Sequence, residues 1–215
     1  MLRSNTLADS VCILSLDGIP MNDGSVVPLI LSVALGEIVA LCGSNQAAKR
    51  TLLDMLVASG SKSAGHVFLK NRPIASDIWK RTRDGMIVIT QNDRIFRELT
   101  VLQNLSLARH DHAPPNRTAM LNHIWTLFPQ LKACRNRNAG TLSGGEQQML
   151  VWARIIVAAP TVVIFEDAWH GLSLDVVDSL VKEVRRLAAG GTSFLFFEDS
   201  LDKAQSYADS VYSVL

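Results

Sequence analysis

The stretch from Gly43 to Thr51 has the residue types and spacing of a loop that binds phosphate. It follows the pattern G-x-x-x-x-G-K-[ST] in part: Gly43 and Lys49 stand in place, whereas Ala48 replaces the second glycine and Arg50 replaces the hydroxyl residue. Such a loop wraps phosphate with backbone N–H groups and a helix N-terminus, while its lysine reaches the outer phosphates and its hydroxyl holds Mg²⁺. Because a guanidinium has no free acceptor, Arg50 cannot take over the metal.

Three further positions predict that phosphate and Mg²⁺ bind weakly here. Thr51 keeps a hydroxyl, but one residue along a helix rotates it by about 100°. Ala48 adds a Cβ where the backbone approaches phosphate, and a left-handed Gln46 would cost on the order of 1 kcal/mol. The alternative is an ordinary turn with solvated Lys49 and Arg50. The candidate phosphate-binding residues are Gly43, Ser44, Asn45, Gln46, Ala47, Ala48, Lys49, Arg50 and Thr51.

Acidic residues follow two apolar runs further along the chain. Glu166 and Asp167 come after one run, and the Glu166 carboxylate could reach the shell of a metal ion. The Asp167 side chain is one methylene shorter than that of a glutamate, and a shift of a carboxylate by about 1 Å can cost roughly a hundredfold in rate. Asp199 comes after another run, where its charge would repel a phosphate. The alternative reading is structural: the pair caps the next helix, and Asp199 is the N-cap of a helix starting near Leu201.

The stretch Leu142–Gln148 reads Leu-Ser-Gly-Gly-Glu-Gln-Gln and is a second candidate for phosphate contact. Ser143 and Glu146 have the spacing of a capping box ahead of an apolar helix, which accounts for those two residues. The glycine pair is better explained by close approach of a phosphate to an outward-facing helix N-terminus. The candidate binding residues are Ser143, Gly144, Gly145 and Gln147.

Four short apolar runs predict the elements that position these groups. They have the length and composition of buried parallel strands, and polar residues follow each one. Ligands of open α/β sheets bind beyond the carboxyl ends of the strands, so the polar groups should meet in one crevice. The predicted strands are Ile38–Cys42, Met86–Ile89, Val162–Phe165 and Ser193–Phe197.

The remaining patterns predict an amphipathic helix, an antiparallel sheet and a helical lobe. Apolar residues spaced by three and four from Leu174 to Leu187 predict a helix that ends at Gly190 and Gly191. Residues 92–140 contain no convincing buried strand. The predicted antiparallel strands are Val11–Leu16, Val26–Val33 and His66–Leu69, and the predicted helices of the lobe are Leu99–Ala108 and Arg117–Phe128.

Length and composition limit the fold classes, partners and compartments that are possible for this chain. The 215 residues are 48% hydrophobic and 19% charged, with a net charge of +1, so a full core is expected and no overall field attracts nucleic acid. Cys12, Cys42 and Cys134 lack metal-site spacing and suit a reducing compartment. The longest apolar stretches are shorter than the roughly 20 residues of a spanning helix, and the first residues lack a signal-peptide core.

Five segments together resemble the ATP-binding subunits of branched-chain amino acid and urea transporters, which are ATP-binding-cassette (ABC) proteins. The similarity covers roughly residues 10 to 215. The segments are Val39–Leu53, Arg94–Leu105, Leu127–Leu150, Gly171–Ser173 and Ala208–Leu215.

The resemblance implies a P-loop NTPase cassette of the α/β class, in one domain spanning residues 1–215. Residues 1–91 and 142–215 would form the core with its antiparallel subdomain, and residues 92–141 the helical lobe. ATP and Mg²⁺ are the implied ligands, with Glu166, Gln91 and Thr51 as a weak metal set and Asp167, Asp199 and Gln91 as an atypical catalytic set. Ile19 and Pro20 fall where an aromatic residue usually stacks on adenine, which predicts poor base recognition.

The departures from the family pattern concentrate in the site that the chain itself would own, whereas the signature at residues 142–148 is complete. The resemblance therefore implies a cytoplasmic subunit, peripheral on the inner face of the membrane, that donates its signature to a second cassette in a heterodimer and works with integral membrane permeases. One alternative is an ordinary transport ATPase with slow Mg-ATP turnover. Another is a nucleotide-free assembly or regulatory subunit. No nucleic-acid partner is expected.

Overall fold

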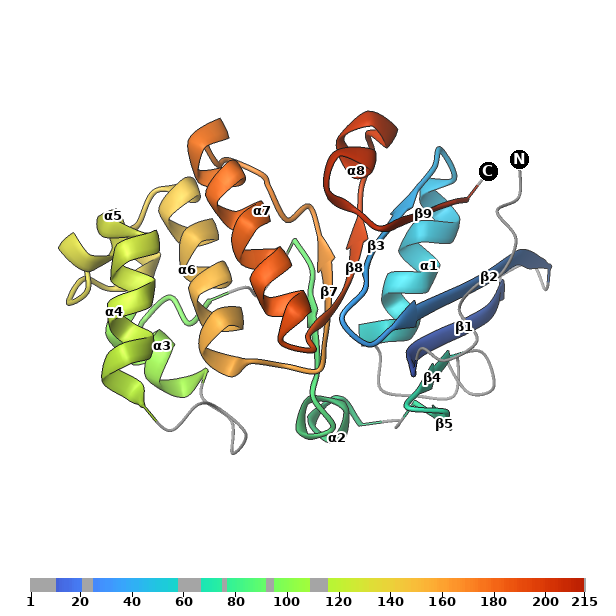
Figure 1. The fold of residues 1–215 in the computed structure, drawn as a ribbon, viewed down its shortest axis with the longest axis horizontal. Helices are drawn as coiled ribbons and strands as arrows, with labels where there is room; N and C mark the ends of the chain where they lie inside the picture. Colours follow the sequence, from blue (N-terminus) through green and yellow to red (C-terminus); the bar gives the residue numbers. More distant parts are fainter. Residues whose placement is uncertain are drawn as a thin grey trace.

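Two β-sheets organise the protein in the computed structural model, which describes residues 11–20, 25–57, 67–74, 77–91, 95–108 and 116–214. The first sheet has five parallel strands in the order β6-β7-β8-β3-β9 (Figure 1). The four strands expected from sequence are confirmed. The strands of this sheet are β3 (Ile38–Cys42), β6 (Met86–Ile89), β7 (Val162–Glu166), β8 (Ser193–Phe197) and β9 (Ser210–Ser213).

The second sheet is antiparallel, as predicted, with the order β2-β1-β4-β5. Its strands are β1 (Cys12–Pro20), β2 (Val26–Ala34), β4 (Val67–Leu69) and β5 (Arg72–Pro73). β1 continues to Pro20 because the register shifts between Asp17 and Ile19, where Gly18 takes a φ of +71°. Ile19 is then fully buried, so its side chain has no free face for a base. His66, the predicted start of the third strand, lies outside the described residues.

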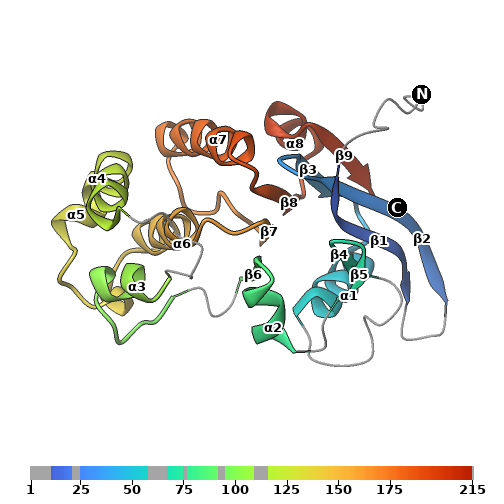
Figure 2. The same cartoon turned by 60° about the horizontal axis from the view of Figure 1, so that its bottom comes forward.

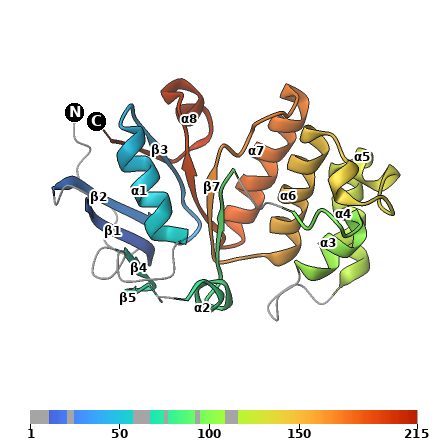
Figure 3. The same ribbon diagram turned by 180° about the vertical axis from the view of Figure 1, so that it is seen from behind.

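Helices cover both faces of the parallel sheet. α6 (Gly144–Ala158) and α7 (Leu174–Ala189) lie on one side of the sheet, and α1 (Gln46–Val57) lies on the other with the antiparallel sheet (Figures 2 and 3). Val163 and Phe165 belong to the buried cluster of α6 and α7, whereas Val162 and Ile164 belong to that of α1 and the antiparallel sheet. This alternation follows from the two-residue repeat of a strand. α7 is the predicted amphipathic helix, and Gly190 is its C-cap. Two shorter helices are α2 (Ile78–Arg83) and α8 (Leu201–Tyr207).

The segment between β6 and α6 is helical in its described part. It contains α3 (Val101–Leu107), α4 (Arg117–Leu127), α5 (Pro129–Ala133) and the 3-10 turn η2 (Ala139–Thr141). The helix expected at Leu99 begins later because Thr100 is its N-cap, in a capping box with Gln103. Within the described ranges, no helix has both the length and the apolar composition needed to cross a bilayer.

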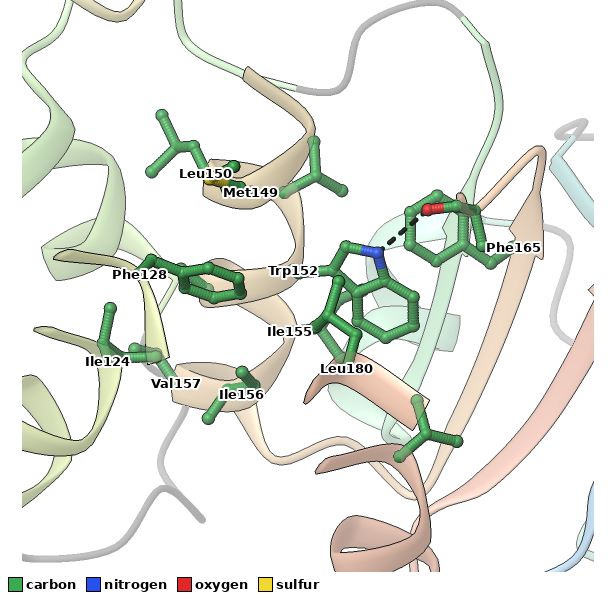
Figure 4. Close-up of a cluster of buried hydrophobic side chains, with 14 of the residues drawn as sticks. Ile124, Phe128, Met149, Leu150, Trp152, Ile155, Ile156, Val157, Phe165 and Leu180 are labelled. Atoms are coloured by element: carbon green, nitrogen blue, oxygen red, sulfur yellow. Dashed lines mark hydrogen bonds between the residues drawn. The ribbon is translucent and has the colours of Figure 1, made fainter. Parts of the chain in front are cut away.

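A buried cluster around Trp152 joins this helical segment to the sheet. Ile124 and Phe128 contribute from the helical segment, and Phe165 contributes from β7 (Figure 4). The Trp152 ring centroid lies 5.0 Å from that of Phe165 and 5.3 Å from that of Trp169. Its Nε1 donates a hydrogen bond of 2.9 Å to the Ala168 carbonyl, so the indole also fixes the loop after β7.

The start of α6 lies against that same loop through two glycines. A Cβ built on Gly145 would come within 2.7 Å of the Gly171 carbonyl oxygen, and Gly171 itself has a φ of +71°. A Cβ on Gly144, by contrast, meets no described atom within 4 Å. Of the two glycines, only Gly145 is therefore required by packing inside the chain.

Replacing Trp152 by alanine should lower the free energy of unfolding by about 3–5 kcal/mol, because a fully buried aromatic side chain is removed. Urea denaturation measures this change. Trp79→Ala is the control, since Trp79 is 57% exposed and its loss should matter far less. Equal destabilisation by the two variants would contradict the packing assigned to Trp152.

Gly144→Ala and Gly145→Ala should change stability in opposite directions. Alanine favours a helix over glycine by up to about 1 kcal/mol, so Gly144→Ala should be neutral or stabilising. Gly145→Ala forces a Cβ against backbone and should destabilise by about 1–3 kcal/mol. Thermal unfolding of both variants measures this contrast, and a stabilised Gly145→Ala would refute the close approach to Gly171.

Candidate functional site

Polar residues from the carboxyl ends of four parallel strands meet around one cavity of about 530 Å³. This is the crevice that the sequence predicts. Of the candidate residues, the structure places seven in its lining: Gln46, Lys49, Arg50, Gln91, Glu166, Asp167 and Asp199. His170 and Lys203 line it as well and were not among the candidates. Both are charged or titratable residues close to a predicted strand end, which is the signal that could have found them.

The loop before α1 is shaped by contacts within the chain. Gly43 has a φ of +136°, and a Cβ there would come within 1.9 Å of the Val214 carbonyl oxygen, so the glycine is required by the segment after β9. Asn45 is the cap of α1, because its Oδ1 accepts a hydrogen bond of 2.9 Å from the Ala48 backbone N–H. The cap therefore uses a backbone donor that a phosphate loop would offer to its ligand.

Two expected sources of steric difficulty in this loop are absent. Gln46 is the first residue of α1 and is not one of the described non-glycine residues with positive φ, so the predicted left-handed strain does not arise. The Ala48 side chain is fully buried in the core, and its Cβ therefore does not project into the cavity. In both cases the helix begins early enough to turn the residue into a regular helical position.

The Lys49 ammonium is bound by Asp199. Lys49 is only 5% exposed, and its Nζ lies 2.6 Å from Asp199 Oδ1 and 3.4 Å from the Glu198 carbonyl oxygen. The hydrogen bond from Lys49, and a second one from Gln46, hold the pKa of Asp199 below its ordinary value. The alternative in which Asp199 caps α8 is wrong, because Ser200 is the N-cap and accepts from the Lys203 backbone N–H.

Of the three residues predicted as a metal set, Glu166 and Gln91 lie together in the lining, whereas Thr51 does not line the cavity. Glu166 Oε2 accepts a hydrogen bond of 3.0 Å from the Gln91 backbone N–H, which ties the ends of β6 and β7 together. Thr51 is absent from the lining of the cavity, whereas its neighbour Arg50 lines it and forms an ion pair of 3.2 Å with Asp54. The side chain that faces the cavity from this turn of α1 is therefore a cation.

Asp167 takes a φ of +56°, in the left-handed region that few non-glycine residues adopt. The turn is held from α6, since Gln148 Nε2 donates to the carbonyl oxygens of Asp167 at 3.4 Å and Ala168 at 2.6 Å. His170 Nδ1 lies 3.4 Å from the Asp167 carboxylate. Gln148 was not a candidate residue, and its role depends on tertiary contact that sequence spacing does not reveal.

The signature residues lie at the start of α6, beside a second cavity that shares Gln91, Asp167 and His170 with the first. Ser143 Oγ accepts from the Glu146 N–H at 3.3 Å, and the Glu146 carboxylate accepts from the Ser143 N–H at 2.8 Å, so the predicted capping box is present. Gly144 is exposed. Gly144 and Gln147 line a cavity of about 420 Å³ that also contains Gln91, Asp167 and His170.

The charged side chains around the larger cavity are paired within the chain. Each cation in the lining has an acidic partner within the chain, and four acids face three cations there. The ion pairs are Lys49 with Asp199, Arg50 with Asp54, and Lys203 with Glu198. An entering phosphate would therefore meet neutralised cations and added negative charge.

Comparison with known proteins identifies the family. Residues 27–169, more than half of the chain, match the ABC transporter family. The chain is similar to the high-affinity branched-chain amino acid transport ATP-binding protein BraG of Pseudomonas aeruginosa, at 28% identity over 85% of this chain and 78% of the relative. The probable branched-chain amino acid transport ATP-binding protein LivF of Archaeoglobus fulgidus is 30% identical over 82% and 75%. The lipopolysaccharide export system ATP-binding protein LptB of Acidithiobacillus ferridurans is 27% identical over 85% and 76%.

Solved structures agree on the fold. An ATP-binding subunit of an ABC transporter superposes with a TM-score of 0.79 at 20% identity, covering 94% of this chain and 85% of the other. At that identity the likeness concerns the fold alone. The sequence match and the fold together lead to one conclusion: the chain belongs to the ABC transporter family, and its relatives there are ATP-binding subunits.

Proposed function

We propose that this chain is the ATP-binding subunit of a branched-chain amino acid type importer, peripheral on the inner face of the membrane, and that it donates its signature to the ATP site of a second cassette. The observation that carries the proposal is the contrast between its two sites. Ser143, Gly144, Gly145 and Gln147 form a complete and open signature, whereas the chain's own cavity has paired cations and added acids.

The geometry of the signature suits a phosphate held by another subunit. The helix behind it runs for fifteen residues, so its N-terminal dipole favours an anion. Ser143 and Gly144 are exposed at its tip, and the capping box holds that tip in place. Donors arranged before the reaction stabilise developing charge without reorganisation, which is how such a tip could raise the rate at a partner's site.

The contacts within the chain's own site argue against the alternative of slow Mg-ATP hydrolysis. Slow Mg-ATP hydrolysis would need Lys49, Thr51 and Glu166 to act together. Lys49 is held by Asp199, Thr51 lies outside the lining, and Glu166 accepts from Gln91. In the proposed heterodimer, the partner's phosphate loop would supply the lysine, the metal and the base, and one competent site would drive closure.

A groove next to the Gln91 segment supports docking of an integral membrane permease. It has a volume of about 470 Å³ and is lined mostly by apolar side chains from α2, β6, α3 and α6. Ile78, Phe96 and Leu107 are 43%, 49% and 59% exposed there, and the Arg154 guanidinium lies over the Phe96 ring. An amphipathic helix of the permease, with an acidic residue facing Arg154, is the occupant that this surface suits.

Purified alone, the chain should hydrolyse ATP far more slowly than a complete cassette, because a homodimer would contain two impaired sites. Steady-state phosphate release measures the rate, and the Lys49→Met and Asp167→Asn variants exclude a contaminant. Turnover at a rate typical of transport ATPases that both substitutions abolish would establish the ordinary-ATPase alternative instead.

Adding the chain to a catalytically complete cassette subunit of the same transporter should raise ATP turnover. Ser143→Arg should remove that gain, and the rate should fall by about 100-fold if the helix tip stabilises the transition state. Ser143→Ala distinguishes the effect of a large side chain from the effect of losing the N-cap, because loss of the cap alone costs about 1 kcal/mol of stability. Ser179→Arg, on the exposed face of α7, is the matched control. If the two subunits bind tightly but Ser143→Arg leaves ATP turnover unchanged, the chain is an assembly or regulatory subunit.

A further inference from the structure

The cation of the phosphate loop already has an anion bound to it in this chain. We infer that the Asp199 carboxylate stands in for a nucleotide phosphate on Lys49 and so closes the loop to nucleotide. The inference deepens the proposed function, on which it rests for the identity of the cavity. It concerns why the chain's own site is closed, whereas the proposal above concerns what the signature does.

The Lys49 ammonium requires an anion wherever it stays in this position. Its side chain is 6% exposed, and a buried ammonium without a partner is strongly unfavourable. Asp199 meets this requirement at 2.6 Å, the short distance of a hydrogen bond between two charged groups. A phosphate oxygen could satisfy the same ammonium only by displacing the carboxylate or by lying next to it.

The Asp199 carboxylate also accepts a hydrogen bond from a second side chain of α1, that of Gln46. Gln46 Nε2 donates to the same Oδ1 at 3.3 Å, so one oxygen accepts hydrogen bonds from two side chains of the first turn of α1. The Ala48 N–H is bonded to Asn45 Oδ1 at 2.9 Å. Three donors that could bind an incoming anion are therefore used within the chain.

The carboxylate occupies the solvent side of the lysine, where a ligand would arrive. The Asp199 side chain is 85% exposed and lines the cavity, whereas the lysine lies behind it. This placement differs from an ion pair buried in a core, because the acid faces the same space as the expected ligand. An approaching phosphate would therefore meet a negative charge before it met the ammonium.

Neighbouring contacts hold Asp199 in place from both sides along the chain. Tyr207 Oη donates to the buried Glu198 carboxylate at 2.9 Å, and Lys203 Nζ lies 3.6 Å from that carboxylate. Ser200 Oγ accepts from the Lys203 N–H and starts α8 directly after Asp199. Removal of the Asp199 charge should leave this framework unchanged and free the lysine.

Asp199→Asn should therefore increase the affinity of the isolated chain for ATP and for inorganic tripolyphosphate by at least tenfold, as measured by titration calorimetry without any partner. Tripolyphosphate tests the phosphate contact independently of base recognition, which the burial of Ile19 disfavours. Asp202→Asn, in the first turn of α8, makes the same change in net charge nearby and should change neither affinity.

The double variant Asp199→Asn with Lys49→Met should lose the gained affinity, which assigns the gain to the lysine. Circular dichroism melts of all variants ensure that only folded protein is compared, and Asp199→Ala gives a second neutral side chain. Equal gains in the Asp199 and Asp202 variants, or no gain in folded Asp199→Asn and Asp199→Ala, would overturn the inference. Neither result would bear on the proposed donation of the signature, which is tested by the effect of the Ser143 variants on the partner's ATP turnover.

Discussion

The inference that this cassette is closed to nucleotide depends on a single requirement: a nearly buried lysine ammonium must have an anion. In a phosphate loop the ligand meets this need, but here Asp199 does so from the end of β8. The contact joins α1 to the strand that pairs with β3 and β7, and Ser200 starts α8 one residue later. The chain can therefore complete the carboxyl edge of its parallel sheet without a nucleotide. In our inference, the same contact removes the attraction that would bring a nucleotide to that edge.

The signature is held by a different set of contacts. Its tip is fixed by the capping box of Ser143 and Glu146, and its helix is fixed by the buried cluster around Trp152. The loop after β7 lies between the two sites, since Gly171 contacts Gly145 while Asp167 lines both cavities. Gln148 and Trp152 both bind the Ala168 carbonyl, so this loop is positioned from the signature helix. The contact at Lys49 plays no part in that positioning.

Sequence reasoning succeeded where a repeating pattern carries the information. The central parallel strands β3, β7 and β8 are buried on both faces and read as short apolar runs. The spacing of apolar residues in α7 is regular, so both kinds of element could be predicted. The Ser143–Glu146 spacing predicted the capping box of α6, whereas the Thr100 cap, which moves the start of α3 from Leu99 to Val101, was not predicted. What failed depended on tertiary contacts or on small shifts of an element's start. Gln46 and Ala48 were read against a loop template, but an earlier helix start makes both regular, and the partner of Lys49 lies 150 positions away.

The independence of the two sets of contacts explains how one site can change while the other persists. A substitution at Asp199 or Arg50 alters charges around one cavity, and neither residue contributes to the lining around the signature. The signature needs only its cap, its glycine contact and the core beneath α6, each of which also supports the fold. The residues that support the proposed donor site are thus also required for stability, because a chain that lost Gly145 or Trp152 would lose packing. In the nucleotide half, Gly43 and Ala48 are held by packing in the same way, whereas the Asp199 and Arg50 side chains are exposed. The charges around the nucleotide cavity can therefore change without loss of packing, although the loop that carries them cannot.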